Sequence, residues 1–213
     1  MRRIFIDGGA NRGQSRSAFL RQWPNSEEFD IHMFEPDSNL FRNLSVSLSS
    51  DKKTTVHNEA VWVRDGEISF YRKFPGSEAN TIFKEKAENQ KWRNIEEVRV
   101  RCVDISRWLK ENTKQDDYII LKIDIEGAEY EVIEHLHVNG AFDRIDILFL
   151  EMHGPKCNKT LKESTKLIET ISKNNLKPYF WEAKKFKYSE YEKNFYDIAA
   201  LKKEYEQYEK ENL

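Results

Sequence analysis

The sequence has few cysteines and no long apolar run, and these two absences exclude several classes of protein. Its two cysteines, Cys102 and Cys157, stand in no CxxC or metal-finger spacing, so neither a disulfide framework nor a zinc finger is expected. No stretch approaches the ~20 apolar residues of a membrane-spanning helix. The first apolar run, residues 4–6, is too short for the core of a signal peptide. We therefore expect a soluble, cytoplasmic protein with reduced thiols.

An excess of charge of either sign is also missing. The 213 residues include 35 lysines and arginines and 37 acidic residues, a net charge of −2, so overall charge gives no reason to expect nucleic-acid binding. Hydrophobic residues make up 38% and charged residues 34% of the chain, which is typical of a globular protein with a charged surface. No repeat or Pro/Gly-rich linker marks a boundary. We expect a single domain over residues 1–213, with residues 200–213 as a solvated helix or frayed end.

Strand-like and helix-like segments alternate along the chain. Strands are expected at residues 3–6, 31–34, 54–63, 67–70, 98–103, 118–123, 145–150, 176–181 and 195–199, and helices at 14–22, 38–48, 107–112, 127–136 and 160–173. Residues 77–94 are polar and irregular. The alternation predicts an α/β fold with a mostly parallel central sheet and helices on both faces. Ligands of such sheets bind beyond the carboxyl ends of the strands, where Asp7, Glu35, Asn58 to Ala60, Asp124 and Glu151 stand.

A loop with three glycines, residues 7–13, follows the first expected strand and precedes a helix. It does not match the dinucleotide pattern G-x-G-x-x-G. It does resemble the arrangement in methyltransferases, with an acid at Asp7, glycines at the third and seventh positions, and Asn11 where many enzymes have glycine. Such a loop would hold the methionine part of S-adenosylmethionine (SAM), with Asp7 suited to the α-ammonium group, directly or through water. Alone, the loop is equally an ordinary turn with Asp7 as a helix cap.

Glu35 narrows the interpretation, because a carboxylate after the second strand can accept hydrogen bonds from both ribose hydroxyls. The alternative is a surface acid at a strand end. Together with the glycine loop, Glu35 indicates a ligand that contains adenosine. Asp104 is a weaker candidate near the adenine, and a helix cap is the simpler interpretation of it. The residues expected to contact the cofactor are Asp7, Gly8, Gly9, Ala10, Asn11, Gly13, Glu35, Pro36, Asn58, Ala60 and Asp124.

Several segments taken together resemble the FkbM family of SAM-dependent methyltransferases. They are FIDGGANRGQ (5–14), FEPD (34–37), NEAV (58–61), LKIDIEGAE (121–129) and the Glu-x-His element in LEMH (150–153). The resemblance implies a Rossmann-like class I methyltransferase fold. It also implies SAM-dependent O-methylation of a sugar hydroxyl, in a glycan or polysaccharide. Gly8 departs from the pattern, because many members have valine or another apolar residue there.

Methyl transfer to an alcohol requires an in-line arrangement of oxygen, carbon and sulfur and removal of the hydroxyl proton. Carboxylates and one imidazole at neighbouring strand ends suit this chemistry, and His153 is the natural base near neutral pH. The expected catalytic residues are Asp124, Glu126, Glu151 and His153. Asp124, Glu151 and His153 also form a possible site for Mg²⁺ or Mn²⁺, which would lower the pKa of the acceptor. Without a metal, the same carboxylates suit hydrogen bonding to a sugar.

Two further functions stay open at this point. One is methylation of a small natural product or a protein side chain. The other is a non-catalytic nucleotide-binding Rossmann module, against which the four expected catalytic residues argue. The expected partners are SAM and a saccharide or glycan acceptor, with no nucleic acid and no membrane span.

Overall fold

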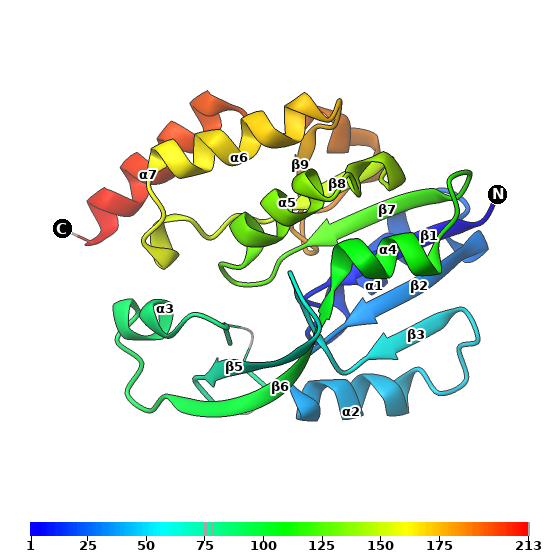
Figure 1. Cartoon of the computed structure of the whole chain (residues 1–213), viewed down its shortest axis with the longest axis horizontal. Coiled ribbons are helices and arrows are strands. Elements are labelled where there is room, and N and C mark those ends of the chain that lie inside the picture. Colours follow the sequence, from blue (N-terminus) through cyan, green and yellow to red (C-terminus); the bar gives the residue numbers. More distant parts are fainter. Residues whose placement is uncertain (75, 78, 213) are drawn as a thin grey trace.

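A parallel sheet of six strands forms the centre of the protein (Figure 1). The computed structural model describes residues 1–74, 76–77 and 79–212. The strand order is β3-β2-β1-β7-β8-β9, and every neighbouring pair in it is parallel. These strands are β1 (Arg3–Gly8), β2 (Phe29–Phe34), β3 (Thr54–His57), β7 (Tyr118–Ile123), β8 (Ile147–Leu150) and β9 (Pro178–Phe180). The order is that of a Rossmann fold, with its switch point between β1 and β7, and it confirms the predicted fold class.

Helices cover both faces of this sheet. The α-helices of the described residues are α1 (Gln14–Gln22), α2 (Ser38–Ser47), α3 (Lys84–Asn89), α4 (Ile105–Asn112), α5 (Glu129–Val138), α6 (Leu161–Lys173) and α7 (Ile198–Asn212), of which α3 lies apart from this sheet (Figure 1). Helices α1 and α2 pack on one face together with residues 181–191, and α4, α5 and α6 pack on the other. None of the described helices is both long and apolar enough to cross a membrane.

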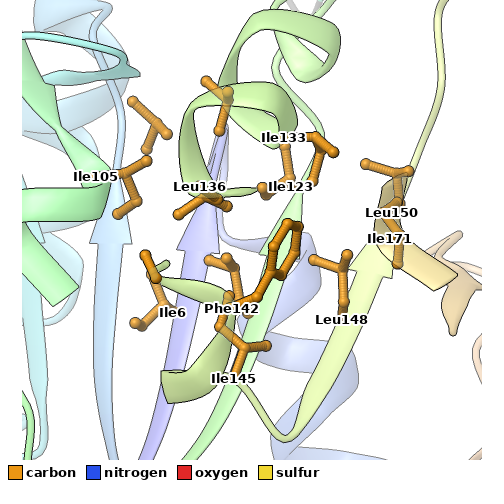
Figure 2. Close-up of a cluster of buried hydrophobic side chains, with 14 of the residues drawn as sticks. Ile6, Ile105, Ile123, Ile133, Leu136, Phe142, Ile145, Leu148, Leu150 and Ile171 are labelled. Carbon is orange, nitrogen blue, oxygen red and sulfur yellow. The ribbon is translucent and has the colours of Figure 1, made fainter. Parts of the chain in front are cut away.

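The core has two halves because neighbouring side chains of a buried strand point to opposite faces. On β1, Ile4 and Ile6 contact the α4–α6 side, whereas Phe5 contacts the α1 side. Figure 2 shows the first half, where residues of the strands, such as Leu148, meet residues of the helices, such as Leu136. Strands buried on both faces explain why these segments are apolar throughout rather than alternating.

A smaller sheet lies beside the main one and contains strands β4 (Ala60–Trp62), β5 (Gly66–Arg72) and β6 (Glu96–Asp104) in the order β4-β6-β5 (Figure 1). The single strand predicted over 54–63 is therefore wrong. The chain leaves the main sheet after His57 and pairs Ala60 with Cys102 of β6 instead. At the break, Asn58 Nδ2 donates to the carbonyl oxygens of Glu35 and Pro36. The segment predicted to be irregular, 77–94, contains the short helix α3.

The strand predicted over 195–199 is also wrong. Of these five residues, Phe195 forms an isolated β-bridge to Tyr179, and α7 begins at Ile198. Asp197 explains the change, because its Oδ1 accepts a hydrogen bond from the Ala200 N–H and so caps the helix. Helix α7 is not merely a solvated tail, since Leu201 is fully buried in the core.

Replacing Leu201 with alanine tests whether α7 is part of the folded core. A buried leucine that becomes alanine loses transfer free energy and leaves a cavity, so Leu201→Ala should lower the free energy of unfolding by about 2–5 kcal/mol. The exposed neighbour Lys202 gives the matched control, and Lys202→Ala should change it by less than about 0.5 kcal/mol. Urea unfolding measures both. Equal, small effects would contradict the packing of α7.

Candidate active site

A buried lysine joins the ends of the two central strands. Lys122 of β7 is 1% exposed, and its Nζ lies 3.0 Å from Asp7 Oδ1 and 3.2 Å from Asp124 Oδ2. The same ammonium group donates to the carbonyl oxygens of Gly8 and Gly9. Burial opposes the charge, but the two carboxylates raise the pKa of Lys122 well above its ordinary value. Lys122 is therefore a charged link between the glycine loop and the end of β7.

Asp7 lies behind the glycine loop rather than in the open site. Its side chain is fully buried, and neither carboxylate oxygen accepts a hydrogen bond of good geometry, although Oδ1 is next to Lys122. Burial raises the pKa of Asp7, and Lys122 opposes that shift. Asp7 is absent from the described residues that line the cavity at the strand ends. Its partner in this structure is Lys122, and a cofactor ammonium group would not reach it directly.

The glycine loop presses against the end of β7. Gly9 has a φ of +81°, and a Cβ placed there would lie 1.8 Å from the carbonyl oxygen of Asp124, so no other residue fits. Asn11 has a φ of 51°, and asparagine is one of the few residues that adopts this left-handed conformation readily. This conformation accounts for asparagine at a position where glycine is common.

Glu35 lies at the end of β2 with both carboxylate oxygens facing backbone N–H groups. Oε2 accepts from Asn11 at 2.7 Å and Oε1 accepts from Asp37 at 2.8 Å. Burial raises the pKa of Glu35 to about 8, and these two N–H groups partly oppose the shift. Each oxygen keeps a further lone pair for a ligand hydroxyl. Glu35 thus holds the glycine loop and presents a hydrogen-bond acceptor to the cavity.

A cavity of about 360 Å³ lies at the carboxyl ends of these strands. Of the residues predicted to contact a cofactor, it is lined by Gly9, Ala10, Asn11, Glu35, Pro36, Ala60 and Asp124. Four others, Asp7, Gly8, Gly13 and Asn58, are not among its described lining residues. Gly13 begins α1 in a left-handed conformation, and Asn58 supports the carbonyls beside Glu35. Glu126 and Glu151 from the predicted catalytic group also line the cavity.

His153 lies next to this cavity and is held by a buried carboxylate. Its Nδ1 lies 3.0 Å from Glu129 Oε1. Glu129 is fully buried and also accepts hydrogen bonds from the N–H groups of Ile125 and Gly127. In the tautomer with hydrogen at Nδ1, donated to Glu129, the Nε2 lone pair is the one that can accept a proton. Nε2 faces the predicted catalytic acids, with Glu126 at 3.3 Å and Asp124 and Glu151 each at 3.9 Å.

Glu126 is fixed by the helix α3 and by its own backbone. Its φ is 57°, and its carbonyl oxygen accepts a hydrogen bond from Thr81 Oγ1 at 2.8 Å. Its carboxylate contacts the ammonium group of Lys86, which is fully buried. Burial lowers the pKa of Lys86 to about 8. Thr81 and Lys86, which lie between β5 and β6, therefore hold Glu126 among the predicted catalytic residues.

A metal ion at this group would have to compete with two lysines. Among the described residues, ligand atoms of Asp124, Glu126 and His153 lie within 4.8 Å of one another. Glu126 thus takes the place that the sequence prediction gave to Glu151. Asp124 already pairs with Lys122 and Glu126 with Lys86. Burial opposes ionisation of Asp124, but Lys122 lowers the pKa of that carboxyl. These residues fit a resident metal ion poorly, because both carboxylates have ammonium partners.

Several contributors were missed at the sequence level. Lys122 had a detectable signal, since a lysine inside a buried apolar strand must be paired. Glu129 belongs to the quoted segment 121–129 but was given no role. Lys86 and the cavity wall formed by residues 181–184 carry no local pattern. The predicted alternative for Asp104, a helix cap, agrees with the structure, since Asp104 Oδ1 accepts from the Arg107 N–H.

Comparison with known proteins gives one family and one solved structure. The model of the methyltransferase FkbM domain matches residues 7–204. The structure titled methyltransferase FkbM from Methylobacillus flagellatus KT is similar with a TM-score of 0.40 and 14% identity. The match covers 65% of this chain and 30% of that chain, so this chain spans less than half of that protein. No curated protein matches the sequence.

The buried carboxyl of Glu35 predicts a pH dependence of stability. A folded-state pKa of about 8 against an ordinary 4.5 means that the folded protein binds this proton more tightly. The stabilisation is complete below about pH 4.5 and is lost as pH rises toward 8, by about 1.4 kcal/mol per pH unit.

Glu35→Gln removes this titration and adds a cost that does not vary with pH. The difference in unfolding free energy between wild type and Glu35→Gln should therefore change with that slope between pH 5.5 and 8. Chemical denaturation at several pH values measures it. A difference that stays constant with pH would show that Glu35 is ionised throughout.

Proposed function

Because the chain belongs to the FkbM methyltransferase family, as the match over residues 7–204 shows, we propose that it uses SAM to methylate a hydroxyl of a sugar, in a glycan or polysaccharide. Family membership supports methyl transfer as the reaction. We propose three further points: that SAM is the methyl donor, that the acceptor atom is an oxygen, and that this oxygen belongs to a sugar. The observation that carries it is one cavity with Glu35 and the glycine loop on one wall and Asp124, Glu126 and Glu151 on another.

The cavity suits the parts of SAM. Glu35 would accept hydrogen bonds from the ribose hydroxyls. Pro36, Leu40, Ala60 and Val61 supply apolar surface for the adenine. The backbone of the glycine loop, brought close to β7 by Gly9, would border the methionine part. Bound there, SAM supplies a methyl group on a positively charged sulfur.

The group around His153 can remove the acceptor proton. With SAM bound, the methyl group would pass to the acceptor oxygen and the sulfur would keep the electron pair of the carbon–sulfur bond. The hydroxyl proton passes to His153 Nε2. Glu129 at Nδ1 then stabilises the protonated ring and keeps it oriented. A positioned base of this kind typically contributes ~10²–10⁴-fold to the rate.

The carboxylates beside His153 would align the acceptor. Glu151 is half-buried, and burial raises its pKa to about 6, with the neighbouring Asp124 adding to the shift. Either as acid or as carboxylate, Glu151 can hydrogen-bond a sugar hydroxyl. A saccharide offers several such hydroxyls, which supports it over the alternatives of a small natural product or a protein side chain.

Binding of S-adenosylhomocysteine, the demethylated product, tests the cofactor half of the proposal. Titration calorimetry should give a dissociation constant in the micromolar range. Glu35→Gln should weaken binding by about 2–10-fold, because it replaces a carboxyl oxygen by an NH₂ donor and a typical hydrogen bond contributes about 0.5–1.5 kcal/mol. His153→Ala should leave the affinity within a few-fold, as should the control His137→Ala, whose ring contacts Asn174 on the outer surface. No binding at millimolar ligand would contradict the proposal.

The metal is tested by chelation. Because Lys86 and Lys122 already pair with Glu126 and Asp124, we expect methyl transfer to persist after dialysis against EDTA. Added Mg²⁺ or Mn²⁺ should change the rate of methyl transfer by less than about two-fold, which is the size expected of a nonspecific effect of ionic strength. Loss of transfer with EDTA and recovery with either ion would establish the cation-assisted mechanism instead.

A further inference from the structure

Glu151 lines two cavities, not one. Besides the cavity described above, a second of about 520 Å³ opens on the carboxyl side of β8 and β9. Its walls include Glu151, Lys156, Phe180, Lys193, Asn194 and Glu204. Glu151 lies 3.9 Å from His153 Nε2, so the second cavity reaches a residue beside the proposed base.

The walls of the second cavity are held by hydrogen bonds between distant segments. Tyr196 is buried, and its hydroxyl accepts from the Met152 N–H at 3.2 Å. The Phe180 N–H donates to Asn194 O at 2.8 Å, and the Tyr196 N–H donates to Pro178 O at 2.9 Å. The residues after β9 therefore form a fixed wall next to the strand ends.

One exposed aromatic ring faces this cavity without a packing partner that buries it. Phe180 is 40% exposed and meets the buried Tyr196 edge-on at 5.6 Å between ring centroids. The other exposed ring, Phe195, already has the Lys177 ammonium over it at 5.4 Å. Phe180 thus offers an apolar face of the size of one ring, as the C–H face of a pyranose requires.

Donors and acceptors surround this ring. Lys156 and Lys193 carry ammonium groups, and neither forms an ion pair within the part of the chain that the structure describes. Glu204 of α7 is half-buried, and burial raises its pKa. Together with Glu151 and the Asn194 amide, these side chains supply both hydrogen-bond donors and acceptors in the cavity that contains the Phe180 ring. A polyol with one apolar face can both stack on Phe180 and hydrogen-bond these groups, whereas a flat aromatic acceptor offers the ring contact but fewer hydroxyls.

Residues that follow β5 also contribute to the cofactor cavity. Asp37, which caps α2, accepts from the Gly76 N–H and from Asn80 Nδ2, at 3.3 and 3.4 Å. Ser77, Asn80 and Ile82 line the cofactor cavity itself. These residues therefore border the same cavity as Glu35 and Pro36, at the proposed nucleoside end.

We infer that the second cavity is the acceptor subsite and that it holds one saccharide ring, stacked on Phe180, with a hydroxyl directed to Glu151 and His153. The inference rests on the proposed function and places the acceptor on the carboxyl-terminal side of the sheet. Lys193, Asn194 and Glu204 then select the sugar by hydrogen bonds to its other hydroxyls.

Amide NMR of the full chain saturated with S-adenosylhomocysteine tests the inference. The probes are the methyl α-pyranosides of glucose, galactose and mannose, with catechol as the flat aromatic comparison. At least one pyranoside should shift the amides of residues 151–156, 180 and 193–204. Phe180→Ala should weaken that binding by about ten-fold or more, as expected for losing about 1.4 kcal/mol. The control Phe74→Ala, an exposed phenylalanine outside this cavity, should leave it unchanged.

Three outcomes would overturn the inference. They are shifts from pyranosides around residues 76–82 instead, shifts at the cavity from catechol but from no pyranoside, or no shifts from any probe. Failure of the proposed function looks different, because S-adenosylhomocysteine would then produce no shifts at residues 9–11 and 35 before any probe is added. Amide spectra also show directly whether each variant is folded.

Discussion

The site depends on one buried ammonium group, that of Lys122. It contacts the carboxylates of Asp7 and Asp124 and the carbonyls of the glycine loop. A charge in a core is stable only when it is paired, and removing one member of a buried pair typically costs about 3–5 kcal/mol. The ends of β1 and β7 therefore cannot move apart without breaking this cluster. The glycine loop and Asp124 therefore keep a fixed relation, because both contact Lys122.

A second buried pair orients the chemistry on the catalytic wall. Glu129, held by the N–H groups of Ile125 and Gly127, fixes His153 through Nδ1 and leaves Nε2 toward Asp124, Glu126 and Glu151. Gly127 has a φ of +116°, and a Cβ there would lie 2.4 Å from Cys157 Sγ. The turn after β7 thus has little freedom, and the carboxylates keep their positions relative to the base.

Sequence reasoning located residues whose position follows from topology. Parallel strands end at one edge, so Glu35, Asp124 and Glu151 after three strands had to lie together, and they line one cavity. Sequence reasoning placed Asp7 at the cofactor, whereas the structure buries it against Lys122. That pairing depends on the register between β1 and β7, which the sequence does not reveal. Sequence reasoning also missed Glu204 and the wall at 181–184, which reach the site only through long-range packing. The strand predicted over 195–199 failed because the cap at Asp197 outweighs the apolar pattern.

Transfer of an isotopically labelled methyl group measures the central claim most directly. The 213-residue chain is incubated with SAM labelled with ¹³C in the methyl group and a panel of mono- and oligosaccharides, and the products are read by NMR. The account predicts a new O-methyl signal on one sugar hydroxyl, absent with His153→Ala and present with His137→Ala. Label that appears only on nitrogen or carbon of another acceptor, or an undiminished signal with His153→Ala, would contradict it.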